Sequence, residues 1–302
     1  MAMPSTSRYV FIVGSPRSGT TILGEILGRH PDVVQWYEPY FIWDYYIGNL
    51  ETDVRSQEHL TEKHRRFIRK EFGRYLKKSG SPLLVEKTPE NSFRIPFIHA
   101  VFPEAKWIHL IRDGRAVTSS IHREWLKRKE IVENRNFKAY WHVVAEMMSL
   151  QPFWRNRLQA LWFEIKYVPT LDPRMFFNKS KWRGHVGWGP RYPGWREEIK
   201  NYTILQFNAR QWLKSVEAVL ENVVLVGNDN FIEVRYEDLV CEPDAQFVKI
   251  FDFLGLAPCE NSIWSDLATG NIDKWRRTFK REEIEEFGPI IDPMLRNLGY
   301  IH

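Results

Sequence analysis

The chain has 302 residues, 43% of them hydrophobic and 27% charged, with a formal net charge of +5; this composition excludes a disordered, collagen-like or disulfide-stapled protein, and the charge favours an anionic ligand. The longest uncharged apolar run near the start, residues 9–14, is far shorter than the ~20 residues that cross a bilayer, and residues 1–7 lack the pattern of a secretory signal, so we expect a cytoplasmic protein without a membrane span. The two cysteines, Cys241 and Cys259, have no CxxC spacing and no histidine cluster beside them, so we expect no metal site.

Short apolar runs that stop at glycine or polar residues predict buried strands, at residues 8–14, 83–85, 107–111 and 231–236. Helical patterns fill the gaps, at residues 58–78, 115–129, 137–149, 204–222, 244–253 and 282–298. This alternation predicts an α/β fold, a three-layer parallel sheet with helices on both faces. We expect residues 1–302 to form a single domain, in which the segment 125–193, rich in Trp, Arg and Pro, is an insertion or cap.

A glycine-rich loop, Gly-Ser-Pro-Arg-Ser-Gly-Thr-Thr at residues 14–21, separates the first predicted strand from a helical pattern. Gly14 and Gly19 have the G-x4-G spacing of a P-loop, in which backbone N–H groups and a helix N-terminus cradle phosphate oxygens. Thr20 stands where a nucleoside-triphosphate loop has its lysine, so this is not a standard Walker A motif. Arg17 offers a planar cation for phosphate or sulfate oxygens. The loop therefore predicts an anion site; the alternative is a plain strand-to-helix turn.

This loop resembles the 5′-phosphosulfate loop of sulfotransferases that use 3′-phosphoadenosine 5′-phosphosulfate (PAPS). The resemblance implies that PAPS is the co-substrate and adenosine 3′,5′-bisphosphate the product, with no metal required. It assigns donor binding within the loop to Arg17, Ser18, Gly19, Thr20 and Thr21.

Three later segments agree with the resemblance. Residues 107–120 are similar to the family's 3′-phosphate segment, which implies Arg112 and Ser120 as ligands of that phosphate. The Arg-Tyr-Glu-Asp-Leu run is similar to a late strand whose tyrosine, here Tyr236, lies near the adenosine. Residues 269–276 look like the loop that closes over the nucleotide, with Trp275 and Arg276 as candidate contacts. Taken alone, each of these residues also fits a structural role, as a capped turn, a core tyrosine or a solvated charge.

Two carboxylates compete for the role of the base that accepts the acceptor's proton. Glu86 opens a Glu-Lys-Thr-Pro run that is similar to the motif of heparan-type glycan sulfotransferases, and Pro89 replaces the histidine that cytosolic phenol and steroid sulfotransferases have there. Glu38 follows the first helix, where tyrosylprotein sulfotransferases carry a glutamate; the Arg-Asp-Gly-Arg-Ala and His-Pro-Asp runs are shared with that group. The sequence ranks Glu86 first and Glu38 second, with Lys87 and Arg17 as cations that stabilise the transferring group.

The predicted function is in-line transfer of a sulfuryl group from PAPS to a hydroxyl or amine acceptor, which is a small molecule, a carbohydrate or a peptide and not a nucleic acid. The alternatives are a P-loop kinase or NTPase, which Thr20 disfavours, and a non-catalytic nucleotide binder. A wall for the acceptor is expected from the cap residues Trp182, Arg183, Trp188, Arg191, Trp195 and Arg196.

Overall fold

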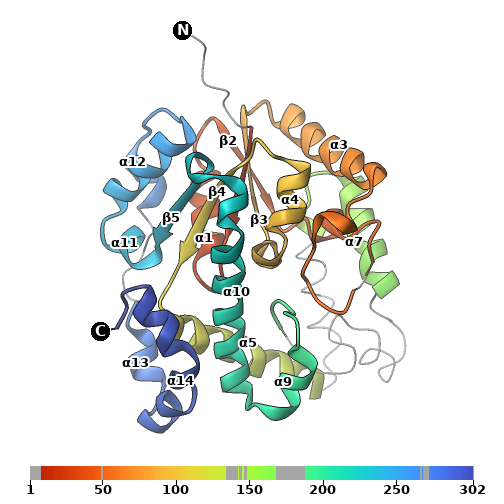
Figure 1. Cartoon of the computed structure of the whole chain (residues 1–302). Helices are drawn as coiled ribbons and strands as arrows, with labels where there is room; N and C mark the ends of the chain where they lie inside the picture. The colour runs from red at the N-terminus through yellow and green to blue at the C-terminus, as the bar shows by residue number, and fades with distance from the viewer. Residues whose placement is uncertain are drawn as a thin grey trace.

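The computed structural model describes residues 8–48, 50–133, 148–167, 188–265 and 272–301, together with residues 142, 145 and 267. Its centre is a five-stranded parallel sheet in the order β2-β3-β1-β4-β5 (Figure 1). The strands are β1 (Tyr9–Val13), β2 (Val33–Tyr37), β3 (Leu83–Lys87), β4 (Lys106–Ile111) and β5 (Phe231–Arg235). The predicted α/β fold is confirmed, and β2 is a strand that the sequence analysis did not identify.

Helices cover both faces of the sheet, which explains why every residue of β1 and β3 is buried. The helices are α1 (Thr20–Leu27), α2 (Tyr40–Trp43), α3 (Glu62–Ser79), α4 (Ile95–Val101), α5 (Gly114–Glu133), α7 (Trp154–Tyr167), α9 (Trp195–Asn201), α10 (Ile204–Val226), α11 (Tyr236–Cys241), α12 (Pro243–Leu254), α13 (Lys274–Thr278) and α14 (Arg281–Asn297). On one face, α3, α4 and α10 pack around Phe11 and Trp107. On the other, α1, α11 and α12 pack around Ile12 and Ile108.

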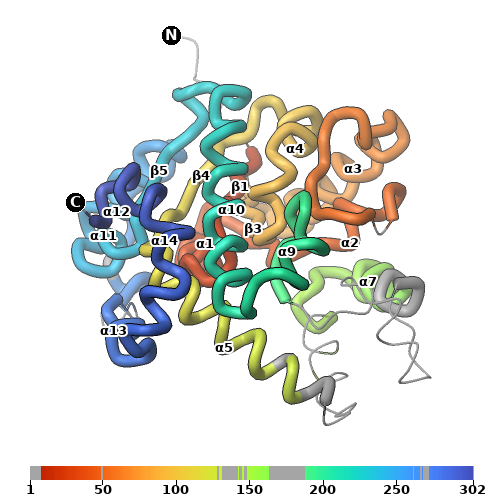
Figure 2. The backbone as a smooth tube through the Cα atoms, turned by 60° about the horizontal axis from the view of Figure 1, so that its bottom comes forward, coloured from red at the N-terminus to blue at the C-terminus, as the bar shows by residue number. Residues whose placement is uncertain are grey.

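A third apolar cluster lies beyond the carboxyl ends of the strands and joins α5, α9, α10 and α14. Figure 2 shows these helices gathered at that end of the molecule, with α7 to one side. Ligands of open parallel sheets bind at this edge, so the predicted site is expected on the same side of the sheet as the third cluster.

The helices predicted at 58–78, 115–129, 204–222, 244–253 and 282–298 correspond to α3, α5, α10, α12 and α14. Most of the predicted helix at 137–149 and much of the predicted cap at 125–193 lie outside the described residues. Of the helices in the described part, none has the length and apolar character that crossing a bilayer demands.

Candidate active site

The glycine loop lies between β1 and α1, and Gly14 is its tightest point. A Cβ atom on Gly14 would stand 2.5 Å from the backbone oxygen of Leu110 in the next strand. The Gly14 N–H donates to Ser92 Oγ (3.1 Å), and the Ser92 hydroxyl donates back to Gly14 O (3.0 Å). Because glycine has no Cβ atom, the loop can pass directly beside β4 at Gly14, and no other residue would fit there.

Gly19 ends the loop as the N-cap of α1, with a left-handed φ of 97°. A Cβ atom there would lie 2.5 Å from Cδ2 of Tyr236. No side chain caps α1, and its first turn contains no acidic residue. The first N–H groups of the helix are therefore oriented for an external anion, as in other phosphate loops.

Arg17 connects the loop to the second predicted phosphate site. Its backbone is left-handed, with a φ of 68°, a conformation that non-glycine residues adopt at a cost. Arg17 Nε donates to Ser120 Oγ on α5 (3.0 Å), and Arg17 O accepts from Arg112 Nη1 (3.2 Å). A weaker contact of 3.9 Å joins the Arg17 guanidinium to Glu124. Arg17, which the resemblance assigns to the 5′-phosphosulfate of PAPS, thus contacts both Arg112 and Ser120, which it assigns to the 3′-phosphate.

Tyr236 forms a wall of this region. Its side chain is 2% exposed, because the ring is packed between Gly19 and the guanidinium of Arg112, which stacks 4.2 Å from the ring centroid. The indole N–H of Trp212 on α10 donates to Arg112 O (3.1 Å) and fixes the arginine's backbone. Trp212 is a positioning residue that the sequence analysis did not identify, since only the fold brings it beside Arg112.

The predicted closing segment is only partly described. Trp275 is buried on α13 between the guanidinium groups of Arg115 (4.5 Å) and Arg276 (4.7 Å). Arg276 forms an exposed ion pair with Asp273 at 2.8 Å. Residues 269–271, which begin the segment, lie outside the described residues.

Glu86 is fully enclosed at the end of β3. Its carboxylate accepts hydrogen bonds from Thr88 Oγ1, Asn91 Nδ2 (2.6 Å) and Trp43 Nε1 (3.4 Å). Burial raises the pKa of Glu86 to about 8, although these hydrogen bonds and the charge of Lys87 oppose the rise. A carboxyl with three protein donors and no exposed surface is poorly placed to reach an acceptor.

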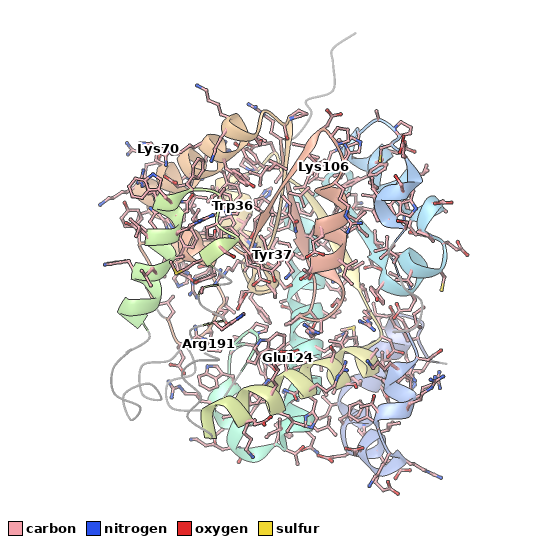
Figure 3. All side chains as sticks on the ribbon, turned by 180° about the vertical axis from the view of Figure 1, so that it is seen from behind. Trp36, Tyr37, Lys70, Lys106, Glu124 and Arg191 are labelled. Carbon is pink, nitrogen blue, oxygen red and sulfur yellow. The ribbon has the colours of Figure 1, made fainter. Side chains whose placement is uncertain are left out.

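Glu38 and Lys87 form an ion pair at the same edge of the sheet. Lys87 Nζ donates to Glu38 Oε1, and the Glu38 N–H donates to Lys87 O (3.1 Å). The Lys87 side chain is 4% exposed and that of Glu38 is 24% exposed. The ammonium also lies 5.1 Å from the ring centroid of Tyr37. In Figure 3, Tyr37 lies near the middle of the molecule, between Lys106 above it and Glu124 and Arg191 below it. Of the two candidate bases, Glu38 is the one that solvent reaches.

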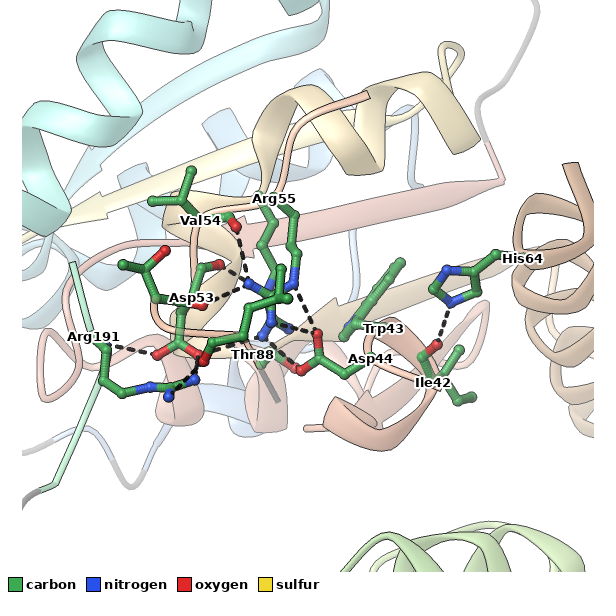
Figure 4. A network of polar contacts seen from close by, with 12 residues as sticks. Ile42, Trp43, Asp44, Asp53, Val54, Arg55, His64, Thr88 and Arg191 are labelled. Carbon is green, nitrogen blue, oxygen red and sulfur yellow. Dashed lines mark hydrogen bonds and ion pairs between the residues drawn. The ribbon is translucent and has the colours of Figure 1, made fainter. Parts of the chain in front are cut away.

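A buried ion network holds the segments beside this edge (Figure 4). Asp44 pairs with Arg55 (2.9 Å) and Arg94 (3.0 Å), and Asp53 pairs with Arg191 (3.1 Å). These five residues come from four separate stretches of chain, so no local pattern in the sequence indicates the network. It joins the segment after α2 to α4 and to the residues that precede α9.

The structure buries two residues of the expected acceptor wall. Arg191 belongs to the buried network, and Trp195 is 1% exposed, with its indole N–H donating to Glu51 O (2.9 Å). Arg196 pairs with the carboxylate of Glu51. Trp188 is half-buried against the third apolar cluster, and Trp182 and Arg183 lie outside the described residues. Trp195 and Arg191 are therefore buried structural residues, and neither side chain is exposed to a ligand.

In the part of the chain that the structure describes, no group of His, Cys, Asp and Glu side chains has the arrangement of a metal site.

The chain is similar in sequence and in fold to proteins that are already known. Nodulation protein NoeE of Sinorhizobium fredii is 29% identical over 130 residues, 38% of this chain and about a third (31%) of that protein's length. Protein-tyrosine sulfotransferase A of Caenorhabditis elegans is 22% identical across 98% of this chain and 68% of its own length. The solved sulfotransferase domain from the curacin biosynthetic pathway shares the fold, with a TM-score of 0.52, 15% identity and coverage of 94% and 96% of the two chains. The profile of the sulfotransferase family matches residues 9–170 and 189–260, and the chain therefore belongs to the sulfotransferase family.

Proposed function

We propose that this protein transfers the sulfuryl group of PAPS to a hydroxyl acceptor at the carboxyl edge of the sheet. The observation that carries the proposal is that the glycine loop, in which Gly14 and Gly19 have no room for a Cβ atom and which contains Arg17, follows a strand paired with the strand that ends in Lys87. Ile12, two residues before the loop, is the register partner of Lys87. Lys87, which pairs with Glu38, therefore lies on the strand next to β1, and β1 leads into the loop that would hold the phosphosulfate.

The residues at this edge fit the charges of PAPS. The N–H groups of Gly19, Thr20 and Thr21, at the start of α1, would bind the 5′-phosphosulfate together with Arg17. Ser18 would shape the loop around that group, since its N–H and its hydroxyl both donate to Ser15 O (3.1 and 2.6 Å). Arg112 and Ser120 would bind the 3′-phosphate, and Tyr236 would form the wall behind it. Trp275 and Arg276 stay candidates for the closing segment. When bound, PAPS supplies the sulfuryl group and the leaving adenosine 3′,5′-bisphosphate.

We propose Glu38, rather than Glu86, as the general base. Glu38 is part-exposed and adjoins Lys87, whereas Glu86 is enclosed and already bonded to three donors. In the transfer, an acceptor oxygen forms a bond to sulfur as the bond from sulfur to the phosphate oxygen breaks, and Glu38 takes the hydroxyl proton. Lys87 and Arg17 would stabilise the negative charge on the group in transfer and on the leaving phosphate. Glu86 would then be a positioning residue that fixes Thr88 and the end of β3.

The acceptor class is proposed from the name of one relative together with the chemistry of the hydroxyl group. The C. elegans relative is named for protein tyrosine, and a phenol hydroxyl needs only one base to lose its proton. We therefore propose a hydroxyl acceptor, with a tyrosine peptide as the first candidate and a sugar or an alkyl alcohol as comparison compounds.

The decisive experiment measures release of adenosine 3′,5′-bisphosphate from PAPS, in the presence of a metal chelator, with these three acceptors. Glu38→Gln should lower kcat by roughly 10²–10⁴ with unchanged affinity for adenosine 3′,5′-bisphosphate in calorimetry, and Glu86→Gln is the matched amide variant that should keep most turnover. A strict Mg²⁺ requirement, or ATP binding as tight as that of adenosine 3′,5′-bisphosphate, would instead support a kinase or NTPase. Full turnover in Glu38→Gln would refute the assignment of the base but not the donor.

A further inference from the structure

The residues that follow α14 reach back to the turn between β5 and α11. Tyr300 Oη donates to Glu237 Oε2 (2.9 Å). Arg235 Nη2 donates to Leu298 O, and the Arg235 guanidinium also lies 5.0 Å from the ring centroid of Tyr300. In Figure 1, α14 and α11 lie at the same side of the molecule, with α14 below. Arg235 and Glu237, the two neighbours of Tyr236 in the chain, therefore both bind this segment.

The position of Tyr300 is fixed by the end of α14. The Tyr300 N–H donates to Leu295 O (2.8 Å), and Gly299 supplies the left-handed residue, with a φ of 73°, that this helix ending requires. Leu295 and Leu298 are buried in the third apolar cluster. Burial, and after it the charge of Glu237, raise the pKa of Tyr300, so the phenol keeps its proton. The hydroxyl is thus a hydrogen-bond donor held in place by a packed helix.

Glu237 also holds the turn that carries Arg112. Its Oε1 accepts from the N–H of Asp113 (3.0 Å), the residue that follows Arg112 in the chain. One residue earlier on each turn, the Arg112 guanidinium stacks 4.2 Å from the ring centroid of Tyr236. Both carboxylate oxygens of Glu237 are therefore engaged, one by the turn between β4 and α5 and one by Tyr300. Through this carboxylate, the segment after α14 is joined to the residue assigned to the 3′-phosphate.

We propose that Tyr300 is a positioning residue for the 3′-phosphate of the donor, acting through Glu237 on Arg112; this inference rests on the proposed use of PAPS. A phosphate gains most from a guanidinium that is fixed before binding, since less freedom is lost in the complex. Without the Tyr300 hydroxyl, the Glu237 carboxylate loses one of its two donors and can turn away from the Asp113 N–H.

A carboxylate that is free to turn would compete with the phosphate. Burial lowers the pKa of Arg112, and the charge of Glu237 opposes this change, so the carboxylate lies close enough to attract the guanidinium. Arginine binds a carboxylate and a phosphate through the same pair of N–H groups. By holding Glu237 on Asp113, Tyr300 keeps the Arg112 guanidinium available to the nucleotide.

The test is calorimetry on the full chain with adenosine 3′,5′-bisphosphate and with AMP, which lacks the 3′-phosphate. Tyr300→Phe should weaken the bisphosphate roughly 3–10-fold and leave AMP unchanged. Glu237→Ala should weaken it on the order of tenfold, although loss of a negative charge beside a phosphate would by itself strengthen binding. Glu237→Gln should keep most of the affinity, because its amide oxygen can accept from Asp113 and its amide N–H can donate to Tyr300 Oη. In an Arg112→Ala background, Tyr300→Phe should change neither affinity.

The matched control is Tyr192→Phe, in the third apolar cluster, which removes a hydroxyl that likewise donates to a glutamate, Glu198 Oε2 (2.6 Å). It should leave the ratio of the two nucleotide affinities unchanged, whatever loss of stability urea unfolding reports for it. Equal weakening of both nucleotides by Tyr300→Phe would overturn the inference, and so would an effect that persists in full in the Arg112→Ala background.

Two further outcomes are distinguishable from these. If Tyr300→Phe does not fold, the contrast between Glu237→Ala and Glu237→Gln decides, and equal bisphosphate affinity in these two variants would overturn the inference. A wild type that binds AMP as tightly as the bisphosphate would refute the proposed donor, and the inference with it. A wild type that prefers the bisphosphate, with the same preference in Tyr300→Phe, would refute the role of Tyr300 alone.

Discussion

Replacing Gly19 with alanine tests the contact between the phosphate loop and Tyr236. The new Cβ would lie 2.5 Å and 2.7 Å from two ring carbons, at a φ of 97°. The ring has little freedom to move away, because it is 2% exposed and is covered by the guanidinium of Arg112 at 4.2 Å. The substitution therefore adds a steric clash to a backbone penalty.

Gly80 separates these two effects. It is the C-cap of α3 with a φ of 75°, and nothing lies within 4 Å of its added Cβ. Gly80→Ala should lower the free energy of unfolding by about 1–2 kcal/mol, the cost of a left-handed alanine. Gly19→Ala should lose that amount plus about 1–3 kcal/mol for overpacking, which gives about 2–5 kcal/mol in total.

Urea unfolding of both variants measures these losses, and a double-mutant cycle with Tyr236→Ala assigns them. Once the ring is gone, Gly19→Ala should cost little more than Gly80→Ala, so the cycle should show a coupling of about 1–3 kcal/mol. Equal losses for Gly19→Ala and Gly80→Ala, or a coupling near zero, would refute the packing of Tyr236 against the loop.

Three further predictions concern charges. Arg112→Ala should weaken adenosine 3′,5′-bisphosphate by about 1.5–3 kcal/mol in calorimetry and should affect AMP, which has no 3′-phosphate, far less. Burial raises the pKa of Glu86 from 4.5 to about 8, so between these values the native state holds a proton that the unfolded chain releases. Stability should fall as pH rises through that window, by at most about 1.4 kcal/mol per pH unit, and Glu86→Gln should flatten this profile in urea unfolding. Asp53→Asn should cost about 3–5 kcal/mol, because it leaves Arg191 buried without its carboxylate.

Each of these predictions has a result that contradicts it. Equal weakening of both nucleotides would make Arg112 a structural residue. A wild-type stability profile as flat as that of Glu86→Gln would mean that Glu86 is ionised in the native state. Asp273→Asn, which breaks an exposed pair, is the control for Asp53→Asn and should change stability by less than about 0.5 kcal/mol; an equal effect of the two would argue against the buried network.

Local features of the chain were sufficient to predict the core of the sheet and the phosphate loop. Strand β1 is five buried apolar residues followed by glycine, a pattern that needs no distant partner to interpret. The sequence analysis did not predict strand β2, because only Val33 and Trp36 of its five residues are buried. The strand lies at one edge of the sheet. Its polar Gln35 breaks the continuous apolar run that identified the other strands.

The proposed order of the two candidate bases, Glu38 before Glu86, rests on burial, which the sequence does not report. Glu86 and Lys87 are adjacent, and adjacent residues of a strand point to opposite faces. Glu86 therefore faces Trp43 and Asn91 in the interior, while Lys87 reaches Glu38. Sequence similarity identified both carboxylates, but only the packing of α2 and of the residues after β3 shows which one is enclosed.

The phosphate loop owes its shape to residues that are synthesised long after it. Ser92 holds Gly14, Ser120 holds Arg17, and Tyr236 packs on Gly19. On a ribosome, the packing of this loop cannot be completed until Tyr236 has left the exit tunnel, although the loop itself emerges among the first residues. A nucleotide ligand stabilises only states that bind it, so it cannot guide the early stages of folding. Up to that point, the sheet can be held only by contacts such as those of the apolar clusters on its two faces.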